Sequence, residues 1–233
     1  MEMPGDAYHV VLAGLLFMAA VMGRNICNLG FIERPLVIGF VWWLCTGQYS
    51  PALPLALFFE LFWLDLFHIG GYIPPMGAFP YLLLLLLSSR FAWSTPAAFT
   101  FPLAILLPLA YLFPYIESRQ RDYQKTASSL LLRQARRNAP LGALPAQQIA
   151  ISIVQQLVIA VSIFIAATAV CYTVFSLNVL EEKTGGIVLN VDWPVLYAIA
   201  AIGSLLSLRI KRAYVVFSLC AIVIIAFKLI SNA

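Results

Sequence analysis

Three side chains that can do chemistry lie close together in an apolar stretch of the sequence, ALFFELFWLDLFHIGG. They are Glu60, Asp65 and His68. A helix turns by about 100° per residue, so on one helix Asp65 and His68 would lie about 140° and about 80° from Glu60. Ionisable residues in apolar helices usually face a bundle interior or a water-filled cavity. The spacing therefore predicts a narrow polar stripe on one helix, backed by the neighbouring aromatic rings.

Three kinds of chemistry fit this stripe. The carboxylate of Glu60 can accept hydrogen bonds from the hydroxyls of a sugar, while an imidazole adds a donor and aromatic rings cover the apolar sugar face. The same groups could relay protons or hold a cation between them. In a structural alternative, Glu60 pairs with Arg24 or Arg34 and joins two helices, and Asp65 and His68 are merely hydrated near the helix end.

Two amides are weaker candidates for the same site. Gln48 follows Gly47 at a helix junction, and Asn28 lies in a polar patch between two apolar runs. Either side chain could bind a hydroxyl beside Glu60. Turn and capping chemistry explains both equally well.

The composition indicates which elements must position these residues. Of 233 residues, 62% are hydrophobic and 10% are charged, whereas a soluble domain has about 45–50% apolar and about 25% charged residues. Several apolar runs approach the roughly 20 residues of a spanning helix, and they are continuous rather than alternating. We therefore expect an all-α, polytopic transmembrane protein, and the small net charge of +4 does not indicate a nucleic-acid partner.

The N-terminal region, residues 1–116, is expected to be broken. A first span over 8–23 precedes a short apolar run over 35–47, and a helix that begins near Pro51 or Pro54 is expected to continue to about Gly70. Prolines then recur every six residues over 96–114, which predicts a kinked or broken element packed inside the protein. Short, proline-interrupted apolar segments are typical of the binding region of transporters.

The remainder of the chain divides into two further regions. Residues 117–148 form a polar segment with six basic and two acidic side chains up to position 137, which the positive-inside rule assigns to the cytoplasm. It is either an amphipathic helix on the membrane surface or a solvated loop. Residues 149–233 are expected to hold three spans, over 149–180, 188–208 and 213–230, and the acidic loop after the first of them is expected outside.

Several motifs are absent from the sequence. It contains no GxxxxGK[ST] phosphate loop, no HExxH and no GxSxG, and its four cysteines form no CxxC pair. We therefore expect no bound cofactor, no metal site and no catalytic residue on this chain. Any chemistry driven by a phosphoryl donor would come from a partner protein.

One stretch, residues 31–75, resembles the membrane IIC component of the mannose/fructose/sorbose class of bacterial sugar phosphotransferase systems. The resemblance rests on an RPL that opens an apolar run, a glycine junction, a single glutamate, an isoleucine–glycine turn and a proline. In this sequence these are Arg34-Pro35-Leu36, Gly47-Gln48, Glu60, His68-Ile69-Gly70 and Pro75. The basic segment before a long span is similar in kind.

The resemblance implies a fold, a function and partners. It implies re-entrant hairpins, a IID-type membrane subunit, and IIC–IID units gathered as trimers in the bacterial cytoplasmic membrane. The sugar would be translocated for phosphorylation by cytoplasmic IIA and IIB phosphocarriers, with no phosphoryl-carrying residue on this chain. Glu60 would be the principal sugar ligand, with Gln48, Asn28, Asp65 and His68 as helpers.

The sequence also departs from that family. Glycines around the glutamate are Ala56, Leu57 and Asp65 here, the junction aspartate is Gln48, and the asparagine of the turn is His68. These departures favour an alternative, a non-transporting membrane assembly protein of the same fold. A proton- or cation-coupled transporter that uses Glu60, Asp65 and His68 is a further alternative.

Overall fold

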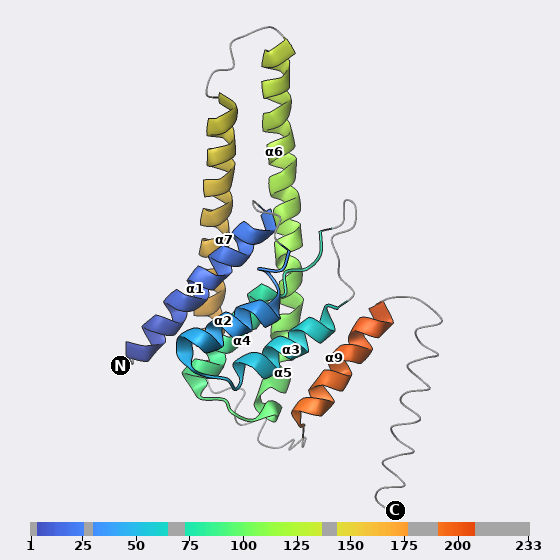
Figure 1. Cartoon of the computed structure of the whole chain (residues 1–233). Coiled ribbons are helices and arrows are strands. Elements are labelled where there is room, and N and C mark those ends of the chain that lie inside the picture. The colour runs from blue at the N-terminus through green and yellow to red at the C-terminus, as the bar shows by residue number, and fades with distance from the viewer. Residues whose placement is uncertain (1–3, 26–29, 65–72, 137–143, 177–190, 208–233) are drawn as a thin grey trace, which may run out of the picture.

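Helices make up all the regular secondary structure in the part of the chain that the structure, a computed structural model, describes (Figure 1). These residues are 4–25, 30–64, 73–136, 144–176 and 191–207. The elements are α1 (Pro4–Asn25), α2 (Pro35–Thr46), α3 (Ala52–Phe62), α4 (Ala78–Phe91), α5 (Pro96–Leu106), the 3-10 segment η1 (Leu107–Tyr111), α6 (Leu112–Arg136), α7 (Leu144–Ser176) and α9 (Trp193–Ser207).

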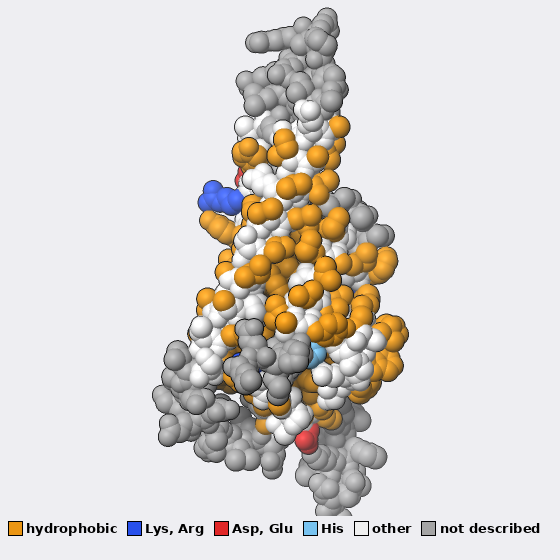
Figure 2. Space-filling view, turned by 90° about the vertical axis from the view of Figure 1, so that its left-hand side faces the viewer, with side chains coloured by type: hydrophobic (Ala, Val, Ile, Leu, Met, Phe, Trp, Pro, Cys, Tyr) orange, Lys and Arg blue, Asp and Glu red, His pale blue; other side chains and the backbone are white. Residues whose placement is uncertain are grey.

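In the described part of the chain, three helical stretches are long and apolar enough to cross a membrane. They are Ala7–Arg24, Pro96–Thr126 and Ala146–Ser176. Large aliphatic side chains are exposed along α7, and hydrophobic side chains spread over the described part of the face in Figure 2. Such a surface is matched by hydrocarbon rather than by water. The expectation of an all-α polytopic membrane protein is confirmed.

Three helices of the N-terminal half are too short to cross alone. At 1.5 Å per residue, α2, α3 and α4, with 12, 11 and 14 residues, are about 16 to 21 Å long, whereas the hydrocarbon layer is about 30 Å thick. Pro35 begins α2, and Gly47 ends it at φ 71°, a left-handed conformation that suits glycine. The expected short helix over 35–47 is confirmed, and α3 and α4 are short as well.

One predicted boundary in this region is wrong. The helix that carries Glu60 ends at Phe62, not near Gly70. The next residue, Trp63, has left the helical conformation with φ −111° and ψ 25°, and its ring lies against Gly77 just before α4. A helical wheel that places Asp65 and His68 beside Glu60 therefore does not apply.

The leucine-rich helix α4 lies at the centre of the molecule. Every residue from Ala78 to Ser88 is buried, so α4 is enclosed by other helices on all sides. Its Tyr81 hydroxyl donates a hydrogen bond of 3.0 Å to the carbonyl of Ala52 in α3. Gly39 of α2 lies against both Tyr81 and Ala56, which lets the three short helices pack closely.

Four phenylalanine rings join α4 to the longer helices. Phe17 of α1 stacks on Phe164 of α7 with ring centroids 4.8 Å apart, and Phe79 of α4 meets Phe113 of α6 edge to face at 4.7 Å. All four are buried. Aromatic pairs in such geometries contribute beyond the area they bury.

The proline-rich block is broken, as expected. It divides into α5, η1 and α6, with Pro102 inside α5 and Pro108 in the 3-10 segment. It is only partly packed inside the protein, because Ile105 and Tyr111 are exposed. α6 then continues without a break past residue 117 to Arg136, so the solvated-loop alternative is wrong up to that residue.

The C-terminal helices differ in detail from the expected spans. α6 and α7 lie side by side as long rods that rise above the short helices (Figure 1). α7 begins five residues before the expected residue 149, and α9 covers 15 residues of the expected span over 188–208. α9 packs along α3, where Gly203 meets Phe62. The expected final span over 213–230 lies outside the described residues.

Candidate functional site

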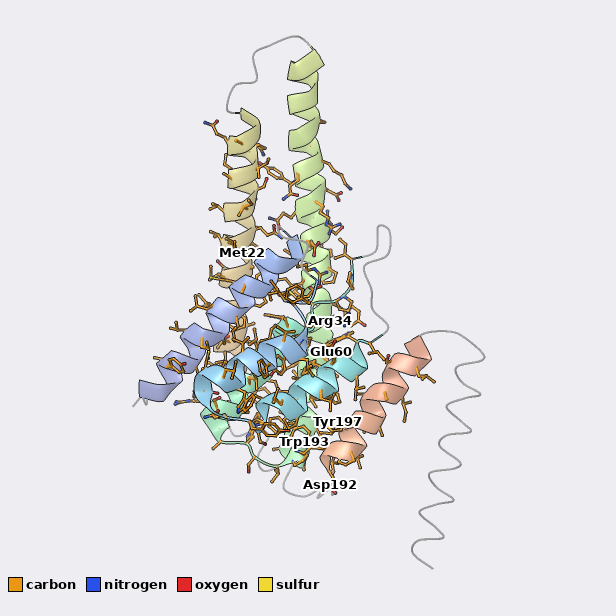
Figure 3. The ribbon with its side chains drawn as sticks, viewed as in Figure 1. Met22, Arg34, Glu60, Asp192, Trp193 and Tyr197 are labelled. Carbon is orange, nitrogen blue, oxygen red and sulfur yellow. The ribbon has the colours of Figure 1, made fainter. Side chains whose placement is uncertain are left out.

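Arg34 and Glu60 meet where the start of α2 passes the end of α3. A short connection joins α2 to α3, so the residue before α2 and the last turn of α3 lie at the same end of this helix pair. Arg34 Nη1 donates to Glu60 Oε1 at 3.0 Å, and both side chains are partly exposed (Figure 3). The structural pairing that the sequence suggested is therefore present, with Arg34 as the partner.

A pocket of about 310 Å³ opens beside this ion pair. We call it the Glu60 pocket. It combines three charged side chains with aromatic rings and prolines, and its lining is Gly30, Phe31, Glu33, Arg34, Pro35, Phe59, Glu60, Trp63, Pro74, Pro75 and Gly77. A cavity of this size with few polar groups in an apolar wall is typical of small-molecule sites.

Two buried polar atoms of residues that line the pocket have no hydrogen-bond partner among the described residues. They are the second carboxylate oxygen of Glu60, Oε2, and the indole nitrogen of Trp63, Nε1. Buried polar groups in native proteins are nearly always bonded to protein, water or ligand. One of the two atoms is an acceptor and the other is a donor, and both belong to residues that line the pocket.

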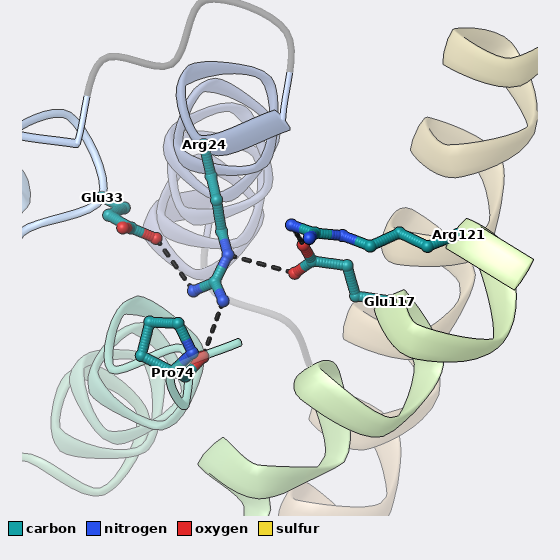
Figure 4. A network of polar contacts seen from close by, with 5 residues as sticks. All are labelled: Arg24, Glu33, Pro74, Glu117 and Arg121. Carbon is teal, nitrogen blue, oxygen red and sulfur yellow. Dashed lines mark hydrogen bonds and ion pairs between the residues drawn. The ribbon is translucent and has the colours of Figure 1, made fainter. Parts of the chain in front are cut away.

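A buried arginine, Arg24, is bonded to two residues that line the pocket, Glu33 and Pro74 (Figure 4). Arg24, at the end of α1, donates to Glu33 at 3.0 Å, to the Pro74 carbonyl at 2.6 Å and to Glu117 of α6 at 3.1 Å. Glu117 also accepts from Arg121. We call these residues the Arg24 cluster.

The cluster is electrically balanced, with two guanidinium groups and two carboxylates. The side chain of Arg24 is only 3% exposed, and a buried charge of this kind is tolerated when it is paired and hydrogen-bonded. Glu33 and Pro74 also line the Glu60 pocket. The cluster therefore ties two parts of the pocket wall to α6.

The structure separates the predicted site residues into three groups. Glu60 lines the pocket. Gln48 is exposed beyond the C-terminal end of α2, where its backbone N–H donates to Thr46 Oγ1 at 3.2 Å, and it is not brought together with Glu60. Asn28, Asp65 and His68 lie outside the described residues.

Other residues of the site were not singled out in the sequence. Trp63 is three positions from Glu60, a spacing that places both on neighbouring parts of a helical surface, but the helical wheel assigned it to the aromatic back. Arg24 was considered only as a partner of Glu60. Within the described ranges, no group of three His, Cys, Asp or Glu side chains is placed to hold a metal ion.

Comparisons with known proteins show similarity in fold. No family model matches the chain, and no curated protein matches its sequence. A solved structure described as a membrane protein is 17% identical with a TM-score of 0.59, over 97% of this chain and 92% of that one. A chain in the cryo-EM structure of the mannose transporter ManYZ with microcin E492 is 18% identical with a TM-score of 0.54, over 100% and 94% of the two chains. The chain thus shares its fold with membrane proteins of known structure, among them a chain from the complex of a sugar transporter.

Proposed function

We propose that this chain is the IIC-type permease subunit of a sugar phosphotransferase system and that it binds a hexose in the Glu60 pocket. The observation that carries the proposal is the unpaired, buried Oε2 atom of Glu60 in a pocket of about 310 Å³. A carboxylate so placed can accept a hydrogen bond from a sugar hydroxyl. The fold likeness to a mannose transporter chain and the sequence pattern over 31–75 support the same class of ligand.

The proposal includes partners. A IID-type membrane subunit would complete the sugar pathway, trimers of the paired subunits would assemble in the bacterial cytoplasmic membrane, and IIA and IIB proteins would supply the phosphoryl group. The long α6–α7 hairpin, with exposed aliphatic side chains along α7, is available to lipid or to a membrane partner. This chain would bind and release the sugar and would carry no phosphoryl group.

The test is hexose binding by the full chain, copurified with its membrane partner and reconstituted in nanodiscs. Radiolabelled D-mannose, D-fructose and L-sorbose serve as probes, and Glu60→Gln is compared with wild type. A hydrogen bond to a charged group contributes about 1.5–3 kcal/mol, so the variant should bind the recognised hexose about ten- to a hundred-fold more weakly.

Asp192→Asn is the matched control, because it makes the same chemical change at an exposed residue at the start of α9. It should bind as wild type does. Unchanged affinity in Glu60→Gln would remove Glu60 from the site, and absence of binding by wild type to all three hexoses would overturn the permease proposal.

A second candidate function, a non-transporting assembly protein, is favoured by one observation. Arg34 forms an ion pair with one carboxylate oxygen of Glu60 at 3.0 Å, as expected of a pair whose role is to join two helices. Under this alternative Arg34→Gln and Glu60→Gln would lower the melting temperature by similar amounts, and no hexose would raise the melting temperature of wild type.

A further inference from the structure

The indole nitrogen of Trp63 is an unused donor in the wall of the Glu60 pocket. Trp63 is 7% exposed, and its Nε1 atom is buried without a partner among the described residues. Buried tryptophans normally give their N–H to an acceptor. Because Trp63 lines the Glu60 pocket, a ligand in the pocket is one source of that acceptor.

The side chain of Trp63 is held in place from two sides. Its rings stack on Phe59, with centroids 5.3 Å apart and planes 23° apart. On another side lies Gly77, where a Cβ atom would come within 2.8 Å of Trp63 Cε3 and 3.0 Å of Cζ3. Gly77 has an ordinary helical φ of −63°, so its backbone conformation does not require glycine. Glycine is needed here because a side chain would collide with the ring of Trp63.

The two unpaired atoms together restrict the chemistry of the ligand. The carboxylate oxygen of Glu60 accepts hydrogen bonds and the indole of Trp63 donates one, and a ligand with hydroxyl groups supplies both a donor and an acceptor. A bare metal cation supplies neither. The chemistry of these two side chains therefore favours a hydroxylated ligand.

We propose that Trp63 is a second ligand-recognition residue of the Glu60 pocket, donating its indole N–H to the unphosphorylated sugar, and that Gly77 sets the position of its ring. This inference rests on the proposed function. It adds a residue that the pattern of carboxylates and histidine did not indicate.

The first experiment compares Trp63→Phe with Trp93→Phe in the same nanodisc binding assay. Phenylalanine keeps an aromatic ring but removes the N–H, so Trp63→Phe should bind D-mannose about three- to ten-fold more weakly, as expected for the loss of one neutral hydrogen bond. Trp93 follows α4 and does not line the pocket, so Trp93→Phe should bind as wild type does.

The second experiment identifies the bonded hydroxyl with monodeoxy derivatives of D-mannose. The derivative that lacks the bonded hydroxyl should bind wild type several-fold more weakly than D-mannose does. In Trp63→Phe the affinities of this derivative and of D-mannose should differ less, because the variant cannot form that hydrogen bond with either sugar. The indole N–H resonance of Trp63, assigned by its loss in Trp63→Phe, should shift when D-mannose is added to ¹⁵N-labelled wild type.

The third experiment tests the role of Gly77. Gly77→Ala should weaken D-mannose binding in wild type, and should have a smaller effect in Trp63→Phe, because the ring atoms that the new methyl group would strike are removed. Equal effects in both backgrounds would overturn the role given to Gly77. The thermal melting of each variant without sugar measures any general loss of folding.

The outcomes separate this inference from the proposed function. If wild type binds D-mannose, and Trp63→Phe binds it equally well with no shift of the Trp63 resonance, Trp63 is not a recognition residue and the permease proposal stands. Should Trp63→Phe fail to fold, the absence of a shift in every indole N–H resonance of wild type with bound D-mannose still overturns it. If wild type binds none of the three hexoses, both proposals fall.

Discussion

The guanidinium of Arg24 is bonded to carboxylates and a carbonyl from three different segments of the chain. Its partners lie 9, 50 and 93 residues away in sequence. In a membrane protein a buried charge has little access to water, so its stability depends on these bonds. Arg24 therefore supports the pocket wall through packing and charge balance rather than through contact with the ligand.

Replacing Arg24 by methionine should strongly destabilise the protein. The substitution leaves Glu33 without this partner and weakens the pairing of Glu117, and breaking a buried pair costs about 3–5 kcal/mol. Thermal melting of the purified protein in detergent should show a large decrease in melting temperature. Arg34→Met, which removes a cation from a partly exposed pair, should cost about 1 kcal/mol, and equal losses would contradict the role given to Arg24.

The residues of the site were only partly predictable. Glu60 stood out because a carboxylate in an apolar segment needs a polar environment, and Arg34 was one of its two suggested partners. Trp63 could not be found in this way, because an unbonded indole N–H is visible only once the surrounding chain is in place. The contacts of Arg24 depend on segments up to 93 residues apart, which no local pattern encodes.

Close packing between the short helices depends on Gly39. A Cβ atom there would lie 2.5 Å from the hydroxyl oxygen of Tyr81 and 2.8 Å from the Cβ atom of Ala56. The tyrosine cannot easily retreat, because its hydroxyl is bonded to the Ala52 carbonyl. The angle and distance between α2, α3 and α4, and with them the shape of the Glu60 pocket, therefore require glycine at this position.

The same substitution at two glycines should have effects of opposite sign. Gly39→Ala forces a methyl group into a packed interior and should cost about 1–3 kcal/mol. Gly14→Ala, in α1, places the methyl group in open space and should stabilise the helix by about 0.5–1 kcal/mol. Thermal melting of both variants measures the difference, and a destabilised Gly14→Ala together with an unaffected Gly39→Ala would contradict this packing.

Elements were predictable where proline or glycine marks their ends. Pro35 and Gly47 bound α2, and the recurring prolines over 96–114 predicted the break that becomes η1. The end of α3 was missed because neither residue type occurs between Leu55 and Ile69. At that point Trp63 packs against Gly77, a contact between two segments that no local pattern encodes.

At the scale of the whole molecule, α7 connects two regions that are expected on opposite sides of the membrane. With 33 residues, it is about 50 Å long, enough to cross a bilayer. Lys125 lies on the basic part of α6, whereas Asp192 lies just before α9, near the lower edge of the molecule in the view of Figure 3. From the distribution of basic residues we expect the first region in the cytoplasm.

Labelling with a membrane-impermeant maleimide should distinguish the two sides. In a background with the four native cysteines replaced by alanine, Asp192→Cys should react in intact spheroplasts, and Lys125→Cys should react only after permeabilisation. Both substitutions lie at exposed positions, so burial does not limit the reaction. If both cysteines react from the same side, the expected orientation is wrong. If Lys125→Cys reacts in intact spheroplasts and Asp192→Cys reacts only after permeabilisation, the protein has the opposite orientation.

The enclosed position of α4 has a consequence for how the chain is assembled in the membrane. Its leucines contact protein on every side in the finished molecule, so their affinity for lipid matters only before the neighbouring helices close around them. A segment this short cannot be anchored by its own partitioning between water and bilayer. We therefore expect α4 to reach its place together with the helices that surround it, and the N-terminal half to insert in a concerted step.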